Sequence, residues 1–214
     1  MTNLDFKNLV LQILNEADAE INGADMIGAD MTKLSTYIEN LYPFAWRRAL
    51  KILPRSWFIT KSFTDAGKVV NPPDGTGYVI LPDDYLALSA FRMKGWRTDC
   101  LTAPEETPAI NAKQKNEYLR GNVYEPVCVL KFISSDNTLK KALYYYSLPK
   151  AGDDTSHVIE NALYIPNVTV LGDNVDIADN GIQALAYLMA ATVLTTLEKD
   201  DAAKKIEARI IELI

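Results

Sequence analysis

The chain has 214 residues with 22 Lys and Arg, 28 Asp and Glu and a single His, which gives a formal net charge of −6. This length suits one domain, or one domain with an inserted lobe, and 48% hydrophobic residues are ordinary for a globular protein. The acidic balance argues against tight, sequence-independent wrapping of nucleic acid, which requires many phosphate neutralisations. The first residues lack the basic start of a signal peptide, and no apolar run reaches the roughly 18 residues that span a bilayer. We therefore expect a soluble protein that is synthesised in the cytoplasm and has no contact with a membrane.

Two cysteines, Cys100 and Cys128, lie 28 residues apart, and the sequence has no CxxC motif. Two are too few for a disulfide scaffold, so a reducing compartment is the simpler interpretation. A single bridge between them stays open from the sequence.

The charge is unevenly distributed along the chain. Residues 1–42 carry a net charge of −5 and residues 43–70 a net charge of +5. Residues 71–150 are close to neutral at +1, and residues 151–214 carry −7. A chain with acidic ends and one basic segment can pair with neighbouring copies of itself.

The first third of the sequence is typical of helices. Apolar residues recur at helical spacing over residues 3–19, and a second helix is predicted from Asp30 through Leu41. Pro43 lacks a backbone donor, so we expect it to break this helix or to restart it as a first-turn proline. A third helical stretch, 43–53, is expected to end before Pro54.

From Ser56 to about Lys150 the pattern changes to short segments rich in β-branched and aromatic residues, separated by turn signals. Residues 102–117 are interpreted as loop, with a short helix at 111–119. Residues 151–178 are rich in Asp and Asn, and we expect a small hairpin or a mobile arm there.

The final third returns to helices. Asp179 is expected to cap a helix that is apolar around nearly its whole circumference, and a charged helix restarts at Asp200 and Asp201. The predicted fold class is therefore α+β, a helical bundle from the N- and C-terminal helices with a β-rich insertion. The expected parts are residues 1–55 plus 179–214 for the bundle and 56–178 for the insertion with its loops.

Three features resemble catalytic or metal-binding motifs, and each has a plainer explanation. His157 lies in a polar stretch, and the sequence has no G-x-S-x-G motif. The Asp173–Asp179 segment spaces its aspartates at i, i+3 and i+6, which does not fit an EF-hand. Asp83 and Asp84 follow a proline at a strand end, where carboxylates make local turn bonds. We expect no enzyme activity and no catalytic, cofactor or metal site; the alternative is a metal-assisted hydrolase that uses these aspartates.

The main basic cluster consists of Arg47, Arg48 and Lys51, with Arg55 just beyond. Arg47 and Lys51 share a helix face because they are four residues apart. The cluster indicates contact with DNA phosphates or with an acidic neighbour. A solvated face with ion pairs inside the chain is the alternative.

Aromatic and apolar residues supply the other predicted positions. We expect four aromatic residues to anchor the core: Tyr42, Phe44, Trp46 and Trp57. The strand containing Tyr144–Tyr146 presents rings to both faces, so at least one ring is expected in an interface, with Tyr145 as the candidate. Ile206 and Ile210, on the apolar stripe of the last helix, complete the predicted interface set.

The order of these parts resembles the head-to-tail connector adaptor family of short-tailed bacteriophages. The family pattern has an N-terminal helix and then a helix that carries a Tyr and an Arg, followed by Leu, Pro and Trp. The corresponding residues here are Tyr42, Arg47 or Arg48, Leu50, Pro54 and Trp57. A strand ending in Leu-Pro-x-Asp-aromatic follows, matched by Leu81–Tyr85.

Two later segments complete the resemblance. An aromatic strand is matched by ALYYYSLP at 142–149, and an Ala- and Leu-rich helix by residues 182–197. The resemblance spans most of the chain, with one departure: residues 151–178 stand where family members often pass more directly to the last helix. Large gut-associated phages of the crAss-like type carry similar ring proteins, so the resemblance extends to them.

The resemblance implies a structural virion protein at the head–tail junction. It implies a homo-oligomeric ring, usually of twelve copies, that binds the portal protein on one side and a tail or second ring protein on the other. Such a ring extends the DNA channel and makes non-specific contact with DNA. The alternatives are a tail-completion or tail-ring protein that does not contact the portal, and a cytosolic protein-binding module.

Overall fold

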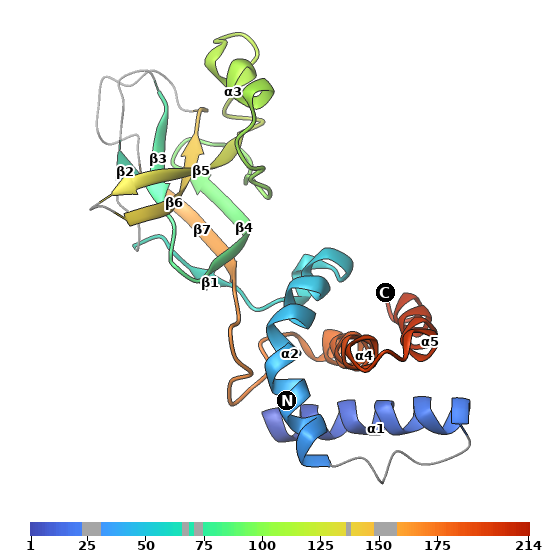
Figure 1. Ribbon diagram of the computed structural model, residues 1–214. Coiled ribbons are helices and arrows are strands. Elements are labelled where there is room, and N and C mark those ends of the chain that lie inside the picture. The colour runs from blue at the N-terminus through green and yellow to red at the C-terminus, as the bar shows by residue number, and fades with distance from the viewer. Residues whose placement is uncertain (23–30, 66–68, 71–74, 136–137, 148–157) are drawn as a thin grey trace. The chain divides into compact units, whose positions relative to one another are not determined.

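The computed structural model describes residues 1–22, 31–65, 69–70, 75–135, 138–147 and 158–214 (Figure 1). Within these residues the fold is α+β, as the sequence predicted. The helices are α1 (Asn3–Asn22), α2 (Met31–Ile52), the 3-10 helix η2 (Arg55–Trp57), α3 (Pro108–Lys115), α4 (Asp179–Thr196) and α5 (Asp200–Ile211). The strands are β1 (Lys61–Ser62), β2 (Val69–Val70), β3 (Gly77–Ile80), β4 (Tyr85–Met93), β5 (Cys128–Ser135), β6 (Thr138–Tyr145) and β7 (Ile159–Pro166).

The chain divides into two compact units. The helical unit comprises residues 1–59 and 167–214, and the β unit comprises residues 60–166. The predicted insertion, 56–178, is longer than the β unit, because the segments at both of its ends group with the helices.

Main-chain pairing explains these boundaries. Phe58 and Ile177 form an antiparallel bridge, and the Ala178 N–H donates to the Trp57 carbonyl over 2.7 Å. The Ile59 N–H donates to the Asp176 carbonyl over 3.2 Å. The chain therefore leaves the helical unit and returns to it along two paired segments.

Helix α4 forms the centre of the helical unit. It packs against α1, α2 and α5, and Figure 1 shows it between α2 and α5 with α1 below. Its buried side chains include large ones, such as Leu185 and Met189, and several alanines. A helix that is apolar on all sides must be covered on all sides, as the sequence indicated.

Prolines often end helices, but α2 runs without interruption through Pro43 from Met31 to Ile52. The prediction of a break or restart there is wrong. Proline removes only the bond that would reach the carbonyl of residue 39, on an exposed part of the helix where water can replace it. Buried residues on both sides, Ile38 and Trp46 among them, hold the helix in place.

An aromatic chain fixes α2 in the core of the helical unit. Tyr42 contacts Phe6 with ring centroids 5.9 Å apart, and Trp46 packs edge-on against Phe58 at 5.1 Å. Tyr42 and Trp46 are at most 1% exposed, which confirms two of the predicted anchors. Phe44 is 60% exposed, so that prediction is wrong. It lies two residues from each buried ring, roughly 200° around the helix.

The β unit contains two antiparallel sheets. One has the strand order β1-β7-β4 and the other β2-β3-β6-β5. Aromatic and aliphatic side chains from both sheets form one core, and it includes Phe63, Phe91, Trp96, Tyr145 and Tyr164. The short segments predicted between Ser56 and Lys150 therefore include strands of both sheets.

The region expected as a hairpin or arm, 151–178, contributes differently. Residues 148–157 lie outside the described residues, and ALYIP forms the end of β7. Strand β7 pairs with β1 and β4, far away in the sequence, so no hairpin forms within this region among the described residues. The predicted short helix at 111–119 is found as α3, which begins at Pro108 with Thr107 as its N-cap.

The starts of α4 and α5 lie close to the predicted positions, but neither N-cap residue makes a side-chain capping bond. Helix α5 begins at Asp200, as predicted. Ala178 occupies the N-cap of α4, one position before the predicted cap Asp179, which is instead the first residue of the helix. No helix in the described part of the chain is both long and apolar enough to cross a membrane.

Trp46 and Phe44 offer a matched test of this packing. Trp46→Ala should lower the free energy of unfolding of the helical unit by about 3–5 kcal/mol, because it empties a fully buried site. Phe44→Ala should change it by less than about 0.5 kcal/mol. Urea unfolding followed by circular dichroism measures both, and equal losses would contradict the opposite orientations of these rings.

Candidate interaction surface

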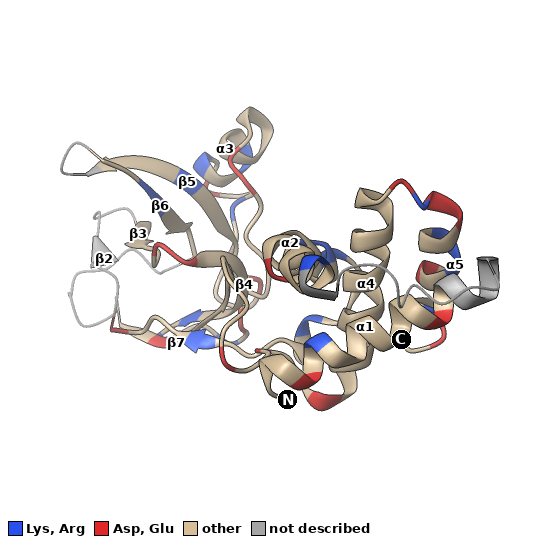
Figure 2. Cartoon of the chain, turned by 60° about the horizontal axis from the view of Figure 1, so that its bottom comes forward, with Lys and Arg blue, Asp and Glu red and all other residues tan. Residues whose placement is uncertain are grey.

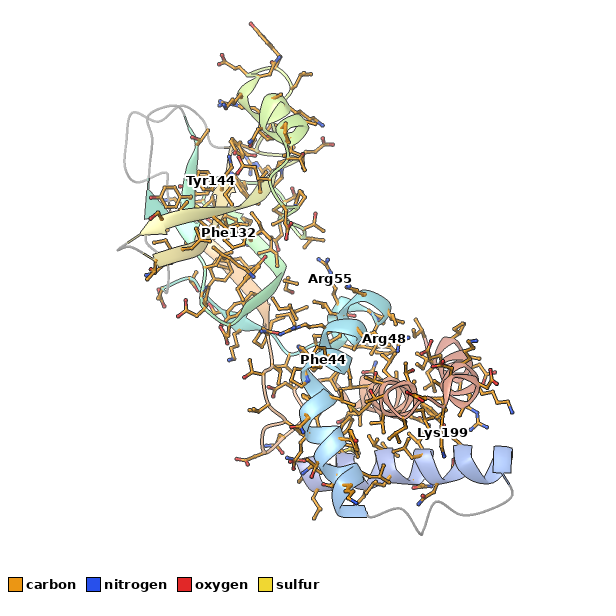
Figure 3. The ribbon with its side chains drawn as sticks, in the orientation of Figure 1. Phe44, Arg48, Arg55, Phe132, Tyr144 and Lys199 are labelled. Atoms are coloured by element: carbon orange, nitrogen blue, oxygen red, sulfur yellow. The ribbon has the colours of Figure 1, made fainter. Side chains whose placement is uncertain are left out.

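The outward face of α2 brings together basic and apolar side chains. Phe44 and Ile52 are 60% and 43% exposed, and Arg47 and Lys51 are also exposed. Arg48, on the same face as Phe44, is half-buried. Figure 3 labels Phe44 and Arg48 on this helix, and Figure 2 shows its basic residues in blue. We call these five residues the α2 surface.

Within the predicted basic cluster, one cation forms an ion pair inside the chain and two do not form one with any described residue. The Arg48 guanidinium lies 2.7 Å from a carboxylate oxygen of Glu207 on α5, and both side chains are about one-third exposed. Arg48 therefore makes the ion pair inside the chain that the sequence left open as an alternative. This pair joins α2 to α5 at the rim of the bundle.

Arg47 and Lys51 behave differently from Arg48. Arg47 donates a hydrogen bond from Nε to the side-chain oxygen of Asn167 over 3.1 Å, an uncharged partner. Within the described residues no acidic side chain forms an ion pair with Arg47 or Lys51. Both side chains are exposed, so their charge is available to a partner.

Arg55 lies beyond the end of α2 in η2, after Pro54. Its side chain is exposed, and Figure 3 shows it near the end of α2. It therefore extends the basic character of the α2 surface without belonging to the helix.

Three predicted interface residues are buried inside their units. Tyr145 is completely buried in the β unit, and Ile206 and Ile210 are at most 3% exposed in the helical unit. This corrects the expectation that they lie on an exposed face. Tyr145 faces the core beside Phe91 and Trp96, and the apolar stripe of α5 packs onto the bundle.

The ring that faces outward in this strand is Tyr144. It stacks on Tyr78 of β3 with centroids 5.0 Å apart, and the Lys131 ammonium lies 4.8 Å from its centroid. Neighbouring residues of a strand point to opposite faces of the sheet. The prediction that Tyr145 lies in an interface therefore placed its ring on the wrong face. Only the strand register relative to the core could have decided this.

The predicted carboxylate pair has a structural role in the β unit. Asp83 is exposed, and Asp84 accepts hydrogen bonds from the Lys61 ammonium at 2.9 Å and the Tyr164 hydroxyl at 2.6 Å. Burial raises the pKa of Asp84, but the bonds from Lys61 and Tyr164 outweigh it and leave the pKa below its usual value. Asp84 thus ties the turn before β4 to β1 and β7.

The other candidate sites do not assemble into a centre. Asp173 and Asp176 use their backbone carbonyls to accept bonds from Asn3 and Ile59. Among the described residues no three His, Cys, Asp or Glu side chains are placed to hold a metal ion. His157 lies outside the described residues.

The structure answers the question that the sequence left open, whether the two cysteines form a bridge. Cys100 and Cys128 are both free and buried, and their side chains are hydrogen-bonded. This bond lowers the pKa of Cys100 to about 7 against the effect of burial, while burial raises that of Cys128. Cys100 also lines a hollow of about 410 Å³ together with residues of the 119–127 loop. The register of Cys128 opposite Tyr145 could not be read from the sequence.

Comparison of the chain with models of protein families gives no match, and comparison with curated proteins gives none either. The functional argument therefore rests on the residues and surfaces described above.

The Arg48–Glu207 pair is expected to contribute little to folding. Because both groups are partly exposed, a double-mutant cycle with Arg48→Ala and Glu207→Ala should give a coupling energy of about 0.2–1 kcal/mol. Urea denaturation of the four chains measures it. A coupling several times larger would mean that the pair fixes α5 onto α2.

The two hydrogen bonds that Asp84 accepts, from Lys61 and Tyr164, form what we call the Asp84 clamp. They predict that stability depends on pH in a defined way. A carboxyl whose pKa is lowered by folding stabilises the protein above its unfolded pKa of about 4 and loses this contribution as the pH falls through the folded value. Asp84→Asn should therefore be less stable than the natural chain at pH 7, and the difference should shrink on acidification below about pH 4. Urea unfolding of both chains across this range tests it; a difference independent of pH would contradict the clamp.

Proposed function

We propose that this chain is a structural virion protein that forms a ring below the portal, joins capsid to tail and extends the DNA channel. The ordered resemblance of its segments to connector adaptors supports this. Those segments now have places in the fold: the end of α2 with η2, the turn at Leu81–Tyr85, strand β6 and helix α4. The proposed location is the head–tail junction of the virion, with a ring of twelve copies as the resemblance implies.

The observation that carries the proposal is the α2 surface. Arg47 and Lys51 project from a helical unit that contains ten basic and fifteen acidic residues, a net charge of −5. Phe44 and Ile52 place apolar area beside these cations. A ring requires two different faces on each copy that bind head to tail, and a basic, partly apolar face on an acidic body suits such a contact.

The same charges bear on contact with DNA. A net charge of −6 repels DNA phosphates at long range, so DNA can slide through a ring of this protein without sticking. Arg47 and Lys51 are too few to overcome this repulsion by themselves. We therefore assign the α2 surface first to a protein neighbour and propose only non-specific contact with DNA.

Binding of the portal protein tests the proposal. The purified full-length chain should bind portal rings and appear as a ring beneath them in electron micrographs. A tail-completion protein, or a tail ring that does not touch the portal, would be found in particles but would not bind isolated portal. Absence of the chain from particles would favour a cytosolic binding module instead.

Charge reversal on the α2 surface tests the observation that carries the proposal. Arg47→Glu combined with Lys51→Glu should weaken ring assembly on the portal by at least about tenfold, because it reverses two cations that no acid of the described chain neutralises. Arg48 is left unchanged, since a Glu at that position would repel Glu207. Sedimentation of the chain with portal rings measures the loss.

A matched control comes from α5, where Lys204 and Lys205 are also exposed. Lys204→Glu with Lys205→Glu makes the same change in net charge and should assemble like the natural chain. Both double variants should melt at the temperature of the natural chain. If the two double variants lose assembly equally, net charge and not the α2 surface governs association.

A further inference from the structure

Strand β5 lies at the edge of the four-stranded sheet, and only its first half is covered. The Leu130 N–H donates to the Pro104 carbonyl over 2.8 Å, and the Leu130 carbonyl accepts from the Glu106 N–H over 3.0 Å. The segment around Glu105 thus lies parallel to this part of the edge. Beyond it the covering segment ends.

The second half of the edge is open. Outward-pointing main-chain groups alternate along a strand, so Phe132 and Ser134 direct their N–H and C=O groups outward as Leu130 does. Thr107 caps α3, which starts at Pro108 and turns the covering chain away. Among the described residues no main-chain group bonds to Phe132 or Ser134 on this side. We call the outward main-chain groups of these two residues the open edge.

The open edge carries few of the features that protect edge strands. Strand β5 pairs with β6 in continuous register without a bulge, and it contains no proline. Phe132 is 58% exposed and Leu139, close by on the same face, is 73% exposed. Lys141, directly opposite Phe132, is also exposed. Figure 3 shows Phe132 on this hairpin.

The helical unit contains a stretch of chain suited to such an edge. Residues 167–170, Asn-Val-Thr-Val, continue from β7 with two β-branched valines and a threonine, residues that favour strands. Thr169 is exposed and Val170 is 69% exposed. None of these four residues makes a main-chain hydrogen bond to another described residue. Asn167 is held by Arg47, so the stretch adjoins the α2 surface.

We propose that the open edge of one copy binds residues 167–170 of a second copy as an added strand. This inference rests on the ring proposed above and identifies one of its contacts. Main-chain bonds at Phe132 and Ser134 would supply the pairing, and the valines would cover part of the exposed Phe132 and Leu139.

Charge argues against the symmetric pairing. Two β5 edges could pair with each other, but that would bring together hairpins that both carry Lys140 and Lys141. The stretch 167–170 instead belongs to a helical unit of net charge −5, with Arg47 beside Asn167 at one end and Asp173 and Asp176 beyond the other. A contact between two different surfaces is heterologous. Repeated from copy to copy, it forms a ring if the rotation between neighbouring copies closes after a whole number of copies.

Cysteine cross-linking of the full chain tests the pairing directly. One variant carries Ser134→Cys and another Thr169→Cys, and a short bis-maleimide is added to each alone and to an equal mixture, with and without portal rings. The mixture should give a covalent dimer and each variant alone should not. The natural chain is the background control, because Cys100 and Cys128 are buried.

The other outcomes separate failure of the added strand from failure of the proposed function. Cross-linking of the Ser134→Cys chain with itself would indicate symmetric edge pairing. No cross-link in the mixture, with portal binding retained, would reject the added strand and leave the proposed ring standing. A cross-link without portal binding would support the added strand and reject the connector function.

A proline substitution tests the main chain separately from the side chain. Ser134→Pro removes an outward N–H that the described chain does not use, whereas Ser134→Ala keeps it. Sedimentation should show self-association at least about tenfold weaker for Ser134→Pro and unchanged for Ser134→Ala. Thermal melting checks that both fold, and Phe132→Ser is the second variant if the proline chain does not. Unchanged association of Ser134→Pro or of Phe132→Ser would overturn the inference.

Discussion

The burial of most of α4 is the constraint on which the helical unit depends. A helix that is apolar on every side needs neighbours all around it, and α1, α2 and α5 supply them. Small residues allow these neighbours to approach closely. At Gly181 an added Cβ would lie 2.9 Å from Ile177, in the segment that returns from the β unit. Each of these three helices has one apolar face, and that face packs against α4.

The chemistry of the α2 surface follows from this constraint. The inner face of α2 contributes Tyr42 and Trp46 to the core, so the opposite face is left to solvent together with Phe44, Arg47 and Lys51. An exposed phenylalanine between cations is not required by the packing of the bundle. A protein neighbour would remove this ring from water and would place an acid near the cations, which gives both residue types a common explanation.

The sequence correctly predicted those features of the fold that depend on local periodicity. The helices α1, α4 and α5 follow from apolar spacing, and α+β follows from the change to short β-branched segments. The prediction of a helix break at Pro43 failed because packing on both sides of the proline outweighs the loss of one helical hydrogen bond.

Properties set by distant parts of the chain could not be predicted in this way. Whether Tyr144 or Tyr145 faces the core depends on the register of β6 against β3 and β5, and a shift of one residue exchanges the two faces. The pairing of β7 with β1 and β4 joins segments about 70 to 100 residues apart. Neither local periodicity nor turn residues encode such partners, and the open edge at Phe132 becomes visible only once they are known.

The two surfaces proposed for assembly are weak separately and depend on each other. The open edge offers main-chain bonds at only two residues, and each hydrogen bond contributes about 1 kcal/mol net in water, which does not offset the entropy lost when two proteins associate. Arg47 links residues 167–170 to the α2 surface through Asn167, so a neighbour that engages one meets the other. In the proposed ring, the charged contact would bring the strand partners to a high effective concentration. In the proposed ring this coupling would keep an incompletely protected edge from pairing with other strands and would reserve it for a copy already held in the right orientation.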